Sequence, residues 1–169
     1  MLFRSFPGVT VDKKTGVAAL SSDLTANFID LPGTYSLYPK RNDEWVAYKI
    51  LLHQDPENIP DMIVLVADAS NLKRSLLFCS QIIDLKIPVV VALTMMDLAK
   101  KKNIKINVPE IERELGAPIV VVNPRKQKGI QDLKKAIELV AVLDKPTSAN
   151  EFIYSSMLAP KAVQEVRSI

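Results

Sequence analysis

Two short segments place a carboxylate directly after an apolar run, where a bound ligand could reach it. In the first, Asp30 follows Phe28 and Ile29, and Pro32-Gly33 comes next. A carboxylate at a strand end can hold a water molecule of Mg²⁺, and glycine lets its backbone N–H come close to a terminal phosphate. Taken alone the signal is weak, because Asp-x-x-Gly is more often a plain turn with an exposed carboxylate.

The second segment is Thr94-Met95-Met96-Asp97, which follows the run "PVVVAL". An aspartate one turn beyond a strand could accept two N–H bonds from the edge of a guanine base. The alternative is structural, because aspartate is also a common residue at the start or the cap of a helix.

Two further segments carry polar groups in loops. One is "VNPRKQKGI", which contains Asn123 and Arg125, and the other is "PGVT", whose Thr10 hydroxyl could ligate a metal. Either segment could be an ordinary loop. All four segments nevertheless occur in one order, with room for a strand or a helix between them, which favours a common site.

The elements that must position these residues alternate along the chain. Short apolar runs suit a parallel sheet covered on both faces, and longer segments have apolar residues at helical spacing. The predicted strands include Phe28-Ile29, Met62–Ala67, Val89–Leu93 and Ile119–Val122, and the predicted helices are Glu44–Leu52, Leu72–Leu85, Val108–Leu115 and Ile130–Val142. This order predicts an α/β domain with right-handed crossovers, whose ligands collect beyond the carboxyl ends of the strands.

Composition narrows the functional classes. The 169 residues are 48% hydrophobic and 24% charged, which is typical of a globular domain. The net charge is +3 and basic residues are scattered apart from Lys100–Lys102, so we expect no nucleic-acid partner. Cys79 is the single cysteine, which excludes an internal disulfide. The apolar runs are too short for a membrane span, so we expect a soluble chain as given.

Three segments resemble one family. "FPGVTVDKKTG", "DLPGTYSLYP" and "DEWVAYKILL" are similar to the switch region, the Asp-x-x-Gly motif and the following helix of the guanine-nucleotide-binding domain of the bacterial ferrous iron transport protein B family. The second segment is a particularly specific match. The likeness runs from about Phe6 to Val142.

The resemblance implies a three-layer, P-loop-GTPase-like α/β fold with a mostly parallel sheet. It also implies GTP or GDP and Mg²⁺ as cofactors. Thr10 would coordinate the metal and Asp30 would hold it through water. The nucleotide would be bound by Gly33, Thr94, Asp97, Asn123 and Arg125, with Gly33 at the γ-phosphate and Asp97 at the guanine base.

The sequence departs from the family in one large respect. Gly-x-x-x-x-Gly-Lys-Ser/Thr does not occur, and Phe6-Pro7-Gly8 comes too early for a strand, phosphate loop and helix to precede it. We therefore expect a chain truncated before its P-loop, with a sheet that lacks the first strand. In the family that strand lies between the strands ending near Asp30 and Ala67, so these two strands should be left unpaired or should pair directly.

Two smaller departures concern the base. Thr94 stands where the family usually has asparagine, and Asn123-Pro124 stands where it has Ser-Ala, whose alanine N–H would donate to guanine. Proline has no N–H to donate, so guanine affinity or selectivity should be reduced. We expect residues 1–143 to form a partial G domain, and residues 144–169 to be a linker and the start of a helical domain.

The leading hypothesis is a fragment of the GTPase domain of a ferrous iron transporter, on the cytoplasmic face of the bacterial inner membrane. Its partner would be the membrane transport domain of the parent protein, and the fragment alone should have little activity. The alternative is a degenerate, non-hydrolysing domain that acts as a protein-interaction or regulatory module. A nucleic-acid-binding GTPase is disfavoured by the weak basic patterning.

Overall fold

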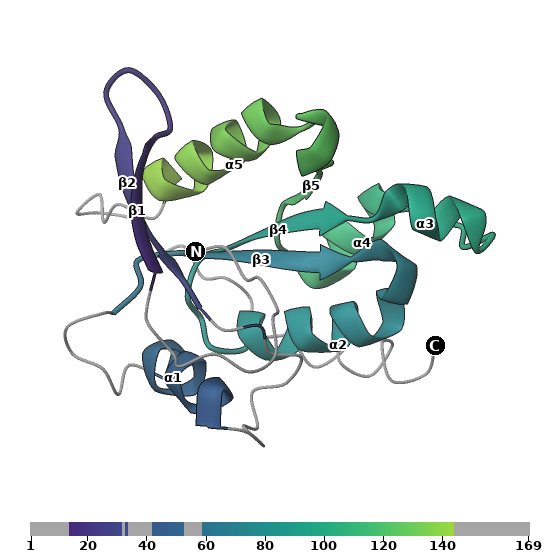
Figure 1. Ribbon diagram of the computed structural model, residues 1–169, viewed down its shortest axis with the longest axis horizontal. Coiled ribbons are helices and arrows are strands. Elements are labelled where there is room, and N and C mark those ends of the chain that lie inside the picture. Colours follow the sequence, from purple (N-terminus) through teal and green to yellow (C-terminus); the bar gives the residue numbers. More distant parts are fainter. Residues whose placement is uncertain (1–13, 32, 34–41, 53–58, 144–169) are drawn as a thin grey trace.

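The structure, a computed structural model, describes residues 14–31, 33, 42–52 and 59–143 (Figure 1). Thr10 and the predicted linker and helical stretches after residue 143 lie outside these residues. The described elements are β1 (Lys14–Ala19), β2 (Thr25–Asp30), α1 (Asn42–Leu51), β3 (Ile63–Asp68), the 3₁₀ helix η1 (Ala69–Asn71), α2 (Leu72–Ile83), β4 (Val89–Thr94), α3 (Met96–Lys101), α4 (Val108–Leu115), β5 (Ile119–Val121), the 3₁₀ helix η2 (Pro124–Lys126) and α5 (Ile130–Leu143).

The strands β3, β4 and β5 form a parallel sheet in that order. β3 and β4 pair from their first residues, Ile63 and Val89, whereas Ile119, the first residue of β5, lies opposite Val91, the third residue of β4. β3 and β4 are runs of apolar, mostly β-branched residues, and such residues are buried on both faces when a parallel sheet is covered by helices. The prediction of a parallel α/β sheet is therefore confirmed.

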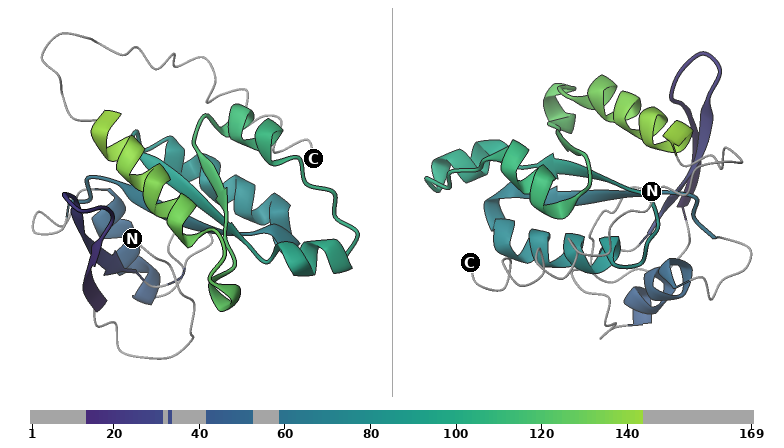
Figure 2. Two further views of the ribbon diagram at one scale, coloured as in Figure 1. Left: turned by 90° about the horizontal axis from the view of Figure 1, so that it is seen from above. Right: turned by 180° about the vertical axis from the view of Figure 1, so that it is seen from behind.

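Helices cover both faces of this sheet. One face packs with α2 and α4 through a core that includes Leu65, Val91 and Ile82, and the other packs with α5 through Val90 and Ile137. Figures 1 and 2 show α5 on one side of the sheet and α1, α2 and α4 on the other. Alternate residues of each strand therefore enter opposite cores, which gives the predicted three layers. No helix in the described part of the chain is long and apolar enough to cross a bilayer.

The strand that ends at Asp30 does not join the parallel sheet. β2 pairs antiparallel with β1, with Lys14 opposite Asp30, and together they form a separate two-stranded sheet. The sequence pattern missed β1 because this strand is almost entirely exposed, with Val17 exposed to 72%. Of the two arrangements expected for β2 and β3, the structure has the one in which they do not pair.

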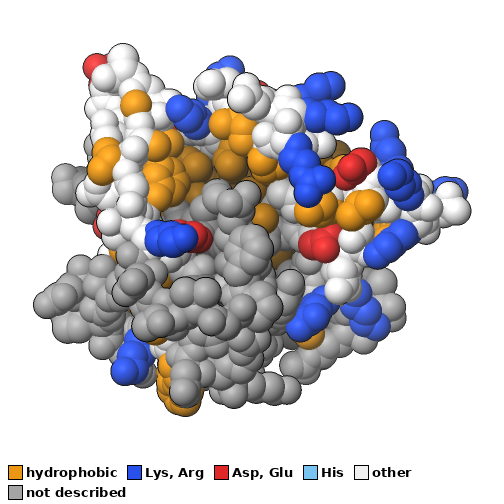
Figure 3. Space-filling model, viewed as in Figure 1, with side chains coloured by type: hydrophobic (Ala, Val, Ile, Leu, Met, Phe, Trp, Pro, Cys, Tyr) orange, Lys and Arg blue, Asp and Glu red, His pale blue; other side chains and the backbone are white. Residues whose placement is uncertain are grey.

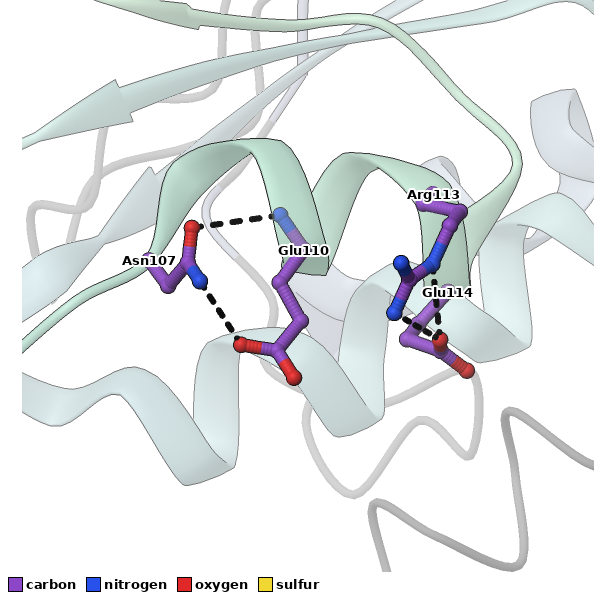
Figure 4. A network of polar contacts seen from close by, with 4 residues as sticks. All are labelled: Asn107, Glu110, Arg113 and Glu114. Carbon is purple, nitrogen blue, oxygen red and sulfur yellow. Dashed lines mark hydrogen bonds and ion pairs between the residues drawn. The ribbon is translucent and has the colours of Figure 1, made fainter.

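Local signals in the sequence set the ends of α4. The Asn107 side chain accepts a hydrogen bond from the Glu110 N–H at 3.4 Å and donates to the Glu110 carboxylate at 2.9 Å (Figure 4). This reciprocal cap satisfies an N–H that the first turn of a helix leaves free. Gly116 ends the helix in the left-handed region, at φ +66°. The caps fix where the chain leaves α4 to enter β5.

Cys79 lies in the core under the parallel sheet and is fully buried. Burial penalises the charged thiolate and raises the pKa of the thiol from 9.0 to about 12. As the pH rises above 9, the unfolded chain therefore loses this proton first, and the free energy of unfolding falls until the pH reaches about 12. Below pH 9 the thiol is neutral in both states, and the stabilisation from burying it is fully present. The total loss should be about 4 kcal/mol, at about 1.4 kcal/mol per pH unit.

The measurement is urea unfolding of the wild type and of Cys79→Ala at several pH values between about 8 and 11. The variant has no thiol to ionise, so the difference in free energy between the two proteins should narrow as the pH rises. Tyrosine and lysine titrations are common to both proteins and cancel in the difference. Parallel curves would contradict the prediction.

Candidate functional site

The carboxyl ends of β4 and β5 lie side by side and carry two of the predicted site residues. Thr94 is the last residue of β4, and Asn123 follows β5 by two positions. The Val122 N–H donates to the carbonyl of Leu93 at 2.9 Å, immediately before both residues. The structure thus brings together the Thr94 and Asn123 segments, which are far apart in the sequence, at one edge of the sheet.

Asp97 stands above the same edge in the first turn of α3. The chain turns out of β4 through Met95, whose φ of +59° is in the left-handed region, and α3 begins at Met96. The Asp97 side chain is exposed and makes no hydrogen bond or ion pair to the described part of the chain. Its two oxygens are free to accept bonds from a ligand. The same position also favours the start of a helix, because a carboxylate in the first turn interacts well with the helix dipole.

The Thr94 side chain is directed at β3 and not at solvent. Its hydroxyl donates to the carbonyl of Ala67 at 3.0 Å, and the bond is partly buried. Thr94 is therefore held in place before any ligand binds. The bond fixes the end of β4, three residues before Asp97.

The loop after β5 is closed on itself. The Asn123 carbonyl and N–H pair with the Lys128 backbone at 3.1 and 2.9 Å, and the Asn123 side chain accepts from the Lys126 N–H at 3.2 Å. Pro124 occupies the first position of η2, where a missing N–H costs little. The Arg125 side chain is exposed beside it. These bonds hold Asn123 and Arg125 at the edge that also carries Asp97.

Basic side chains surround this end of the molecule. Lys100, Lys101 and Lys102 are all exposed at the end of α3. Figure 3 shows lysine and arginine side chains, with a few acidic ones among them, over the region where α3 lies. A polyanionic ligand would be attracted to this edge by the local charge.

Asp30 ends β2, in the two-stranded sheet and not in the parallel one, and Gly33 follows it by three positions. Asp30 Oδ1 is the one buried side-chain oxygen or nitrogen among the described residues that has no hydrogen-bond partner. A buried oxygen without a partner is costly, and a cation or its water would satisfy it. The described residues contain no cluster of three or more metal-binding side chains. A lone carboxylate fits Mg²⁺, which usually takes one or two carboxylates together with phosphates and waters.

Sequence reasoning missed Asp68, which ends β3 as Asp30 ends β2. The Asp68 carboxylate accepts from the Ser70 N–H at 2.8 Å. The signal was present, because "IVLVAD" places a carboxylate directly after an apolar run, as the Asp30 segment does. The Asp68 backbone also bonds the Ser75 hydroxyl of α2, through its N–H at 3.0 Å and its carbonyl at 3.1 Å, and the sequence carries no signal for this contact.

Comparison with known proteins gives a consistent result. A profile described as ferrous iron transport protein B matches residues 4–137. The Fe(2+) transporter FeoB of Leptospira biflexa is 43% identical over 130 residues, which is 77% of this chain and 18% of the transporter. The Fe(2+) transporter FeoB of Escherichia coli K12 is 37% identical over 134 residues, which is 79% of this chain and 17% of the transporter. The chain thus spans less than a fifth of the length of these relatives.

Solved structures agree with the sequence comparison. The FeoB G-domain from Methanococcus jannaschii matches with a TM-score of 0.69 and 34% identity, covering 78% of this chain and 81% of that one. The cytosolic domain of the Thermotoga maritima FeoB iron transporter in a GDP form matches with a TM-score of 0.67 and 39% identity, covering 81% and 52%. At these identities the likeness concerns sequence as well as fold.

Proposed function

Because the chain belongs to the ferrous iron transport protein B family, we propose that it supplies the guanine-recognising edge of that family's GTP-binding domain. The observation that carries this proposal is the free carboxylate of Asp97, exposed above the carboxyl ends of β4 and β5. Parallel sheets bind ligands at this edge. Asp97 would accept two hydrogen bonds from guanine, and the Asn123–Lys128 loop would border the base from the neighbouring strand.

The metal belongs to the same proposal. Asp30 Oδ1, buried without a partner, would bind a water molecule of Mg²⁺, and the backbone N–H of Gly33 would approach the terminal phosphate. Mg²⁺ supplies charge neutralisation at the phosphates when it is bound. Thr10 would be a direct metal ligand. In the whole protein, the nucleotide state of this domain would regulate Fe²⁺ uptake through a membrane transport domain at the cytoplasmic face of the inner membrane.

Binding is the property to test first. Titration of the chain with a fluorescent GDP should show binding that is strengthened by Mg²⁺, and the same titration with ADP should show weaker binding. In Asp30→Asn the strengthening by Mg²⁺ should fall by about 10-fold, because a group that orients a metal through water usually contributes 10- to 100-fold to affinity. Asp61→Asn, an exposed carboxylate before β3, is the matched control and should behave as the wild type.

Two outcomes would count against the proposal. Equal binding of GDP and ADP would contradict the assignment of a guanine site. If Mg²⁺ strengthens GDP binding equally in Asp30→Asn and in the wild type, Asp30 is not part of the metal site. The proposal for guanine recognition would be unaffected by that result.

A further inference from the structure

One turn at the end of β3 receives a hydrogen bond from each end of the α3 segment. This turn, Ala67–Ser70, is called the β3 turn below. Thr94, two residues before α3, donates from its hydroxyl to the carbonyl of Ala67 at 3.0 Å. Lys102, one residue after α3, donates from Nζ to the carbonyl of Ser70 at 3.2 Å. The helix that carries Asp97 is thus attached at both ends to the neighbouring strand.

The β3 turn is itself held by side chains. The Ser75 hydroxyl accepts from the Asp68 N–H at 3.0 Å and donates to the Asp68 carbonyl at 3.1 Å. The Asp68 carboxylate accepts from the Ser70 N–H at 2.8 Å. Ser75 lies on α2, so these bonds attach the turn to that helix. The carbonyls of the β3 turn, at Ala67 and Ser70, are therefore held in place for the side chains that donate to them.

The α3 helix needs such an anchor. It has only six residues, and a helix of this length has no stability of its own in water. It is preceded by Met95 in the left-handed region, a conformation that costs a non-glycine residue free energy. Ala99 is buried and Met96 packs against the same core, so the helix also has two apolar contacts. The bonds that Thr94 and Lys102 make add to these contacts and help to fix the position of Asp97.

We propose that Thr94 is a positioning residue for guanine recognition, which acts through its hydroxyl on the Ala67 carbonyl to hold Asp97 at the base. The inference rests on the proposed function, because it assigns Asp97 to the base. Thr94 itself does not contact guanine in this arrangement. Lys102 is the second attachment, and the exposed position of its bond makes it the weaker of the two.

The test separates the hydroxyl from the shape of the side chain. Thr94→Val removes the hydroxyl and keeps the branched shape, whereas Thr94→Ser keeps the hydroxyl. Thr25→Val, at an exposed position of β2, is the matched control for the exchange of threonine for valine. Each protein is titrated with GDP and with IDP, which lacks the 2-amino group that Asp97 would bind.

The wild type should prefer GDP over IDP by about 10-fold or more, as expected for a hydrogen bond to a charged group. In Thr94→Val the ratio should fall to about threefold or less, whereas Thr94→Ser and Thr25→Val should keep the wild-type ratio. An unchanged ratio in Thr94→Val would overturn this inference and leave the proposed function intact. No preference for GDP in the wild type would overturn both.

A second readout uses the chain without nucleotide. The Ala99 N–H bonds to the Met95 carbonyl at 3.0 Å, and the Val91 N–H bonds to the Pro118 carbonyl at 2.8 Å in the sheet. In Thr94→Val, amide hydrogen exchange at Ala99 should be about fivefold faster or more, while exchange at Val91 stays as in the wild type. Equal exchange at Ala99 in both proteins would overturn the positioning role.

Discussion

Gly129→Ala is expected to destabilise the fold by about 3 kcal/mol or more. Gly129 has a φ of +76°, and a Cβ built on it would overlap the carbonyl oxygen of Val121 and lie 3.2 Å from the Cα of Val122. Both neighbours are backbone atoms of β5 and of the residue after it, so neither can move away as a side chain could. The substitution adds a strained conformation to a steric clash at the start of α5.

Alanine substitutions at two other glycines distinguish the cost of the strained backbone conformation from the cost of the steric clash. Gly116 has a φ of +66° with nothing within 4 Å of the added Cβ, so Gly116→Ala should cost only the strain, about 1 to 2 kcal/mol. Gly16 has open space around it and no positive φ, so Gly16→Ala should change stability little or raise it by up to about 1 kcal/mol. Urea unfolding of the three variants measures the series. Equal losses in Gly129→Ala and Gly116→Ala would show that the close approach to Val121 carries no cost.

Asp97→Asn is expected to change the base that the chain prefers. Guanine presents N–H groups to the carboxylate, which only accepts hydrogen bonds, and xanthine presents a carbonyl in place of the amino group. The amide introduced by Asp97→Asn can donate to that carbonyl. GDP affinity should fall by about 10- to 100-fold, because hydrogen bonds to a charged group are lost. Affinity for xanthosine diphosphate should rise above that for GDP.

The control is Asp84→Asn, which alters an exposed carboxylate at the C-cap of α2, on the opposite edge of the sheet. It should leave the affinities for both nucleotides unchanged. Competition with a fluorescent GDP gives the two affinities for each protein. If Asp97→Asn binds both diphosphates as the wild type does, the base lies elsewhere.

The helices and the buried strands could be predicted because their signals are local. The helix over Val108–Leu115 has the predicted bounds, with Asn107 and Gly116 as caps, and β4 differs from the prediction by one residue. Apolar periodicity fixes which face of an element is buried, and caps fix where it begins and ends. The strand-end positions of Asp30 and Thr94 followed from the same signals, as did the place of Asp97 three residues beyond the end of β4.

The antiparallel hairpin could not be predicted in this way. β1 has no apolar alternation, because its residues are almost all exposed, and β2 was therefore grouped with the strands of the parallel sheet. A strand that buries little apolar surface is held by its backbone bonds to a partner, and these leave no period in the sequence.

By itself, the sequence determined the α/β class, the carboxylates at the strand ends and the family. Only the tertiary structure decided which strands pair, that the Thr94 hydroxyl is used on Ala67, and that Gly129 must pass close to Val121. The physical reason is the sequence separation over which each kind of interaction acts. Periodicity and caps report interactions within a few residues, whereas Thr94 and Ala67 are 27 positions apart and meet only because two buried strands lie side by side.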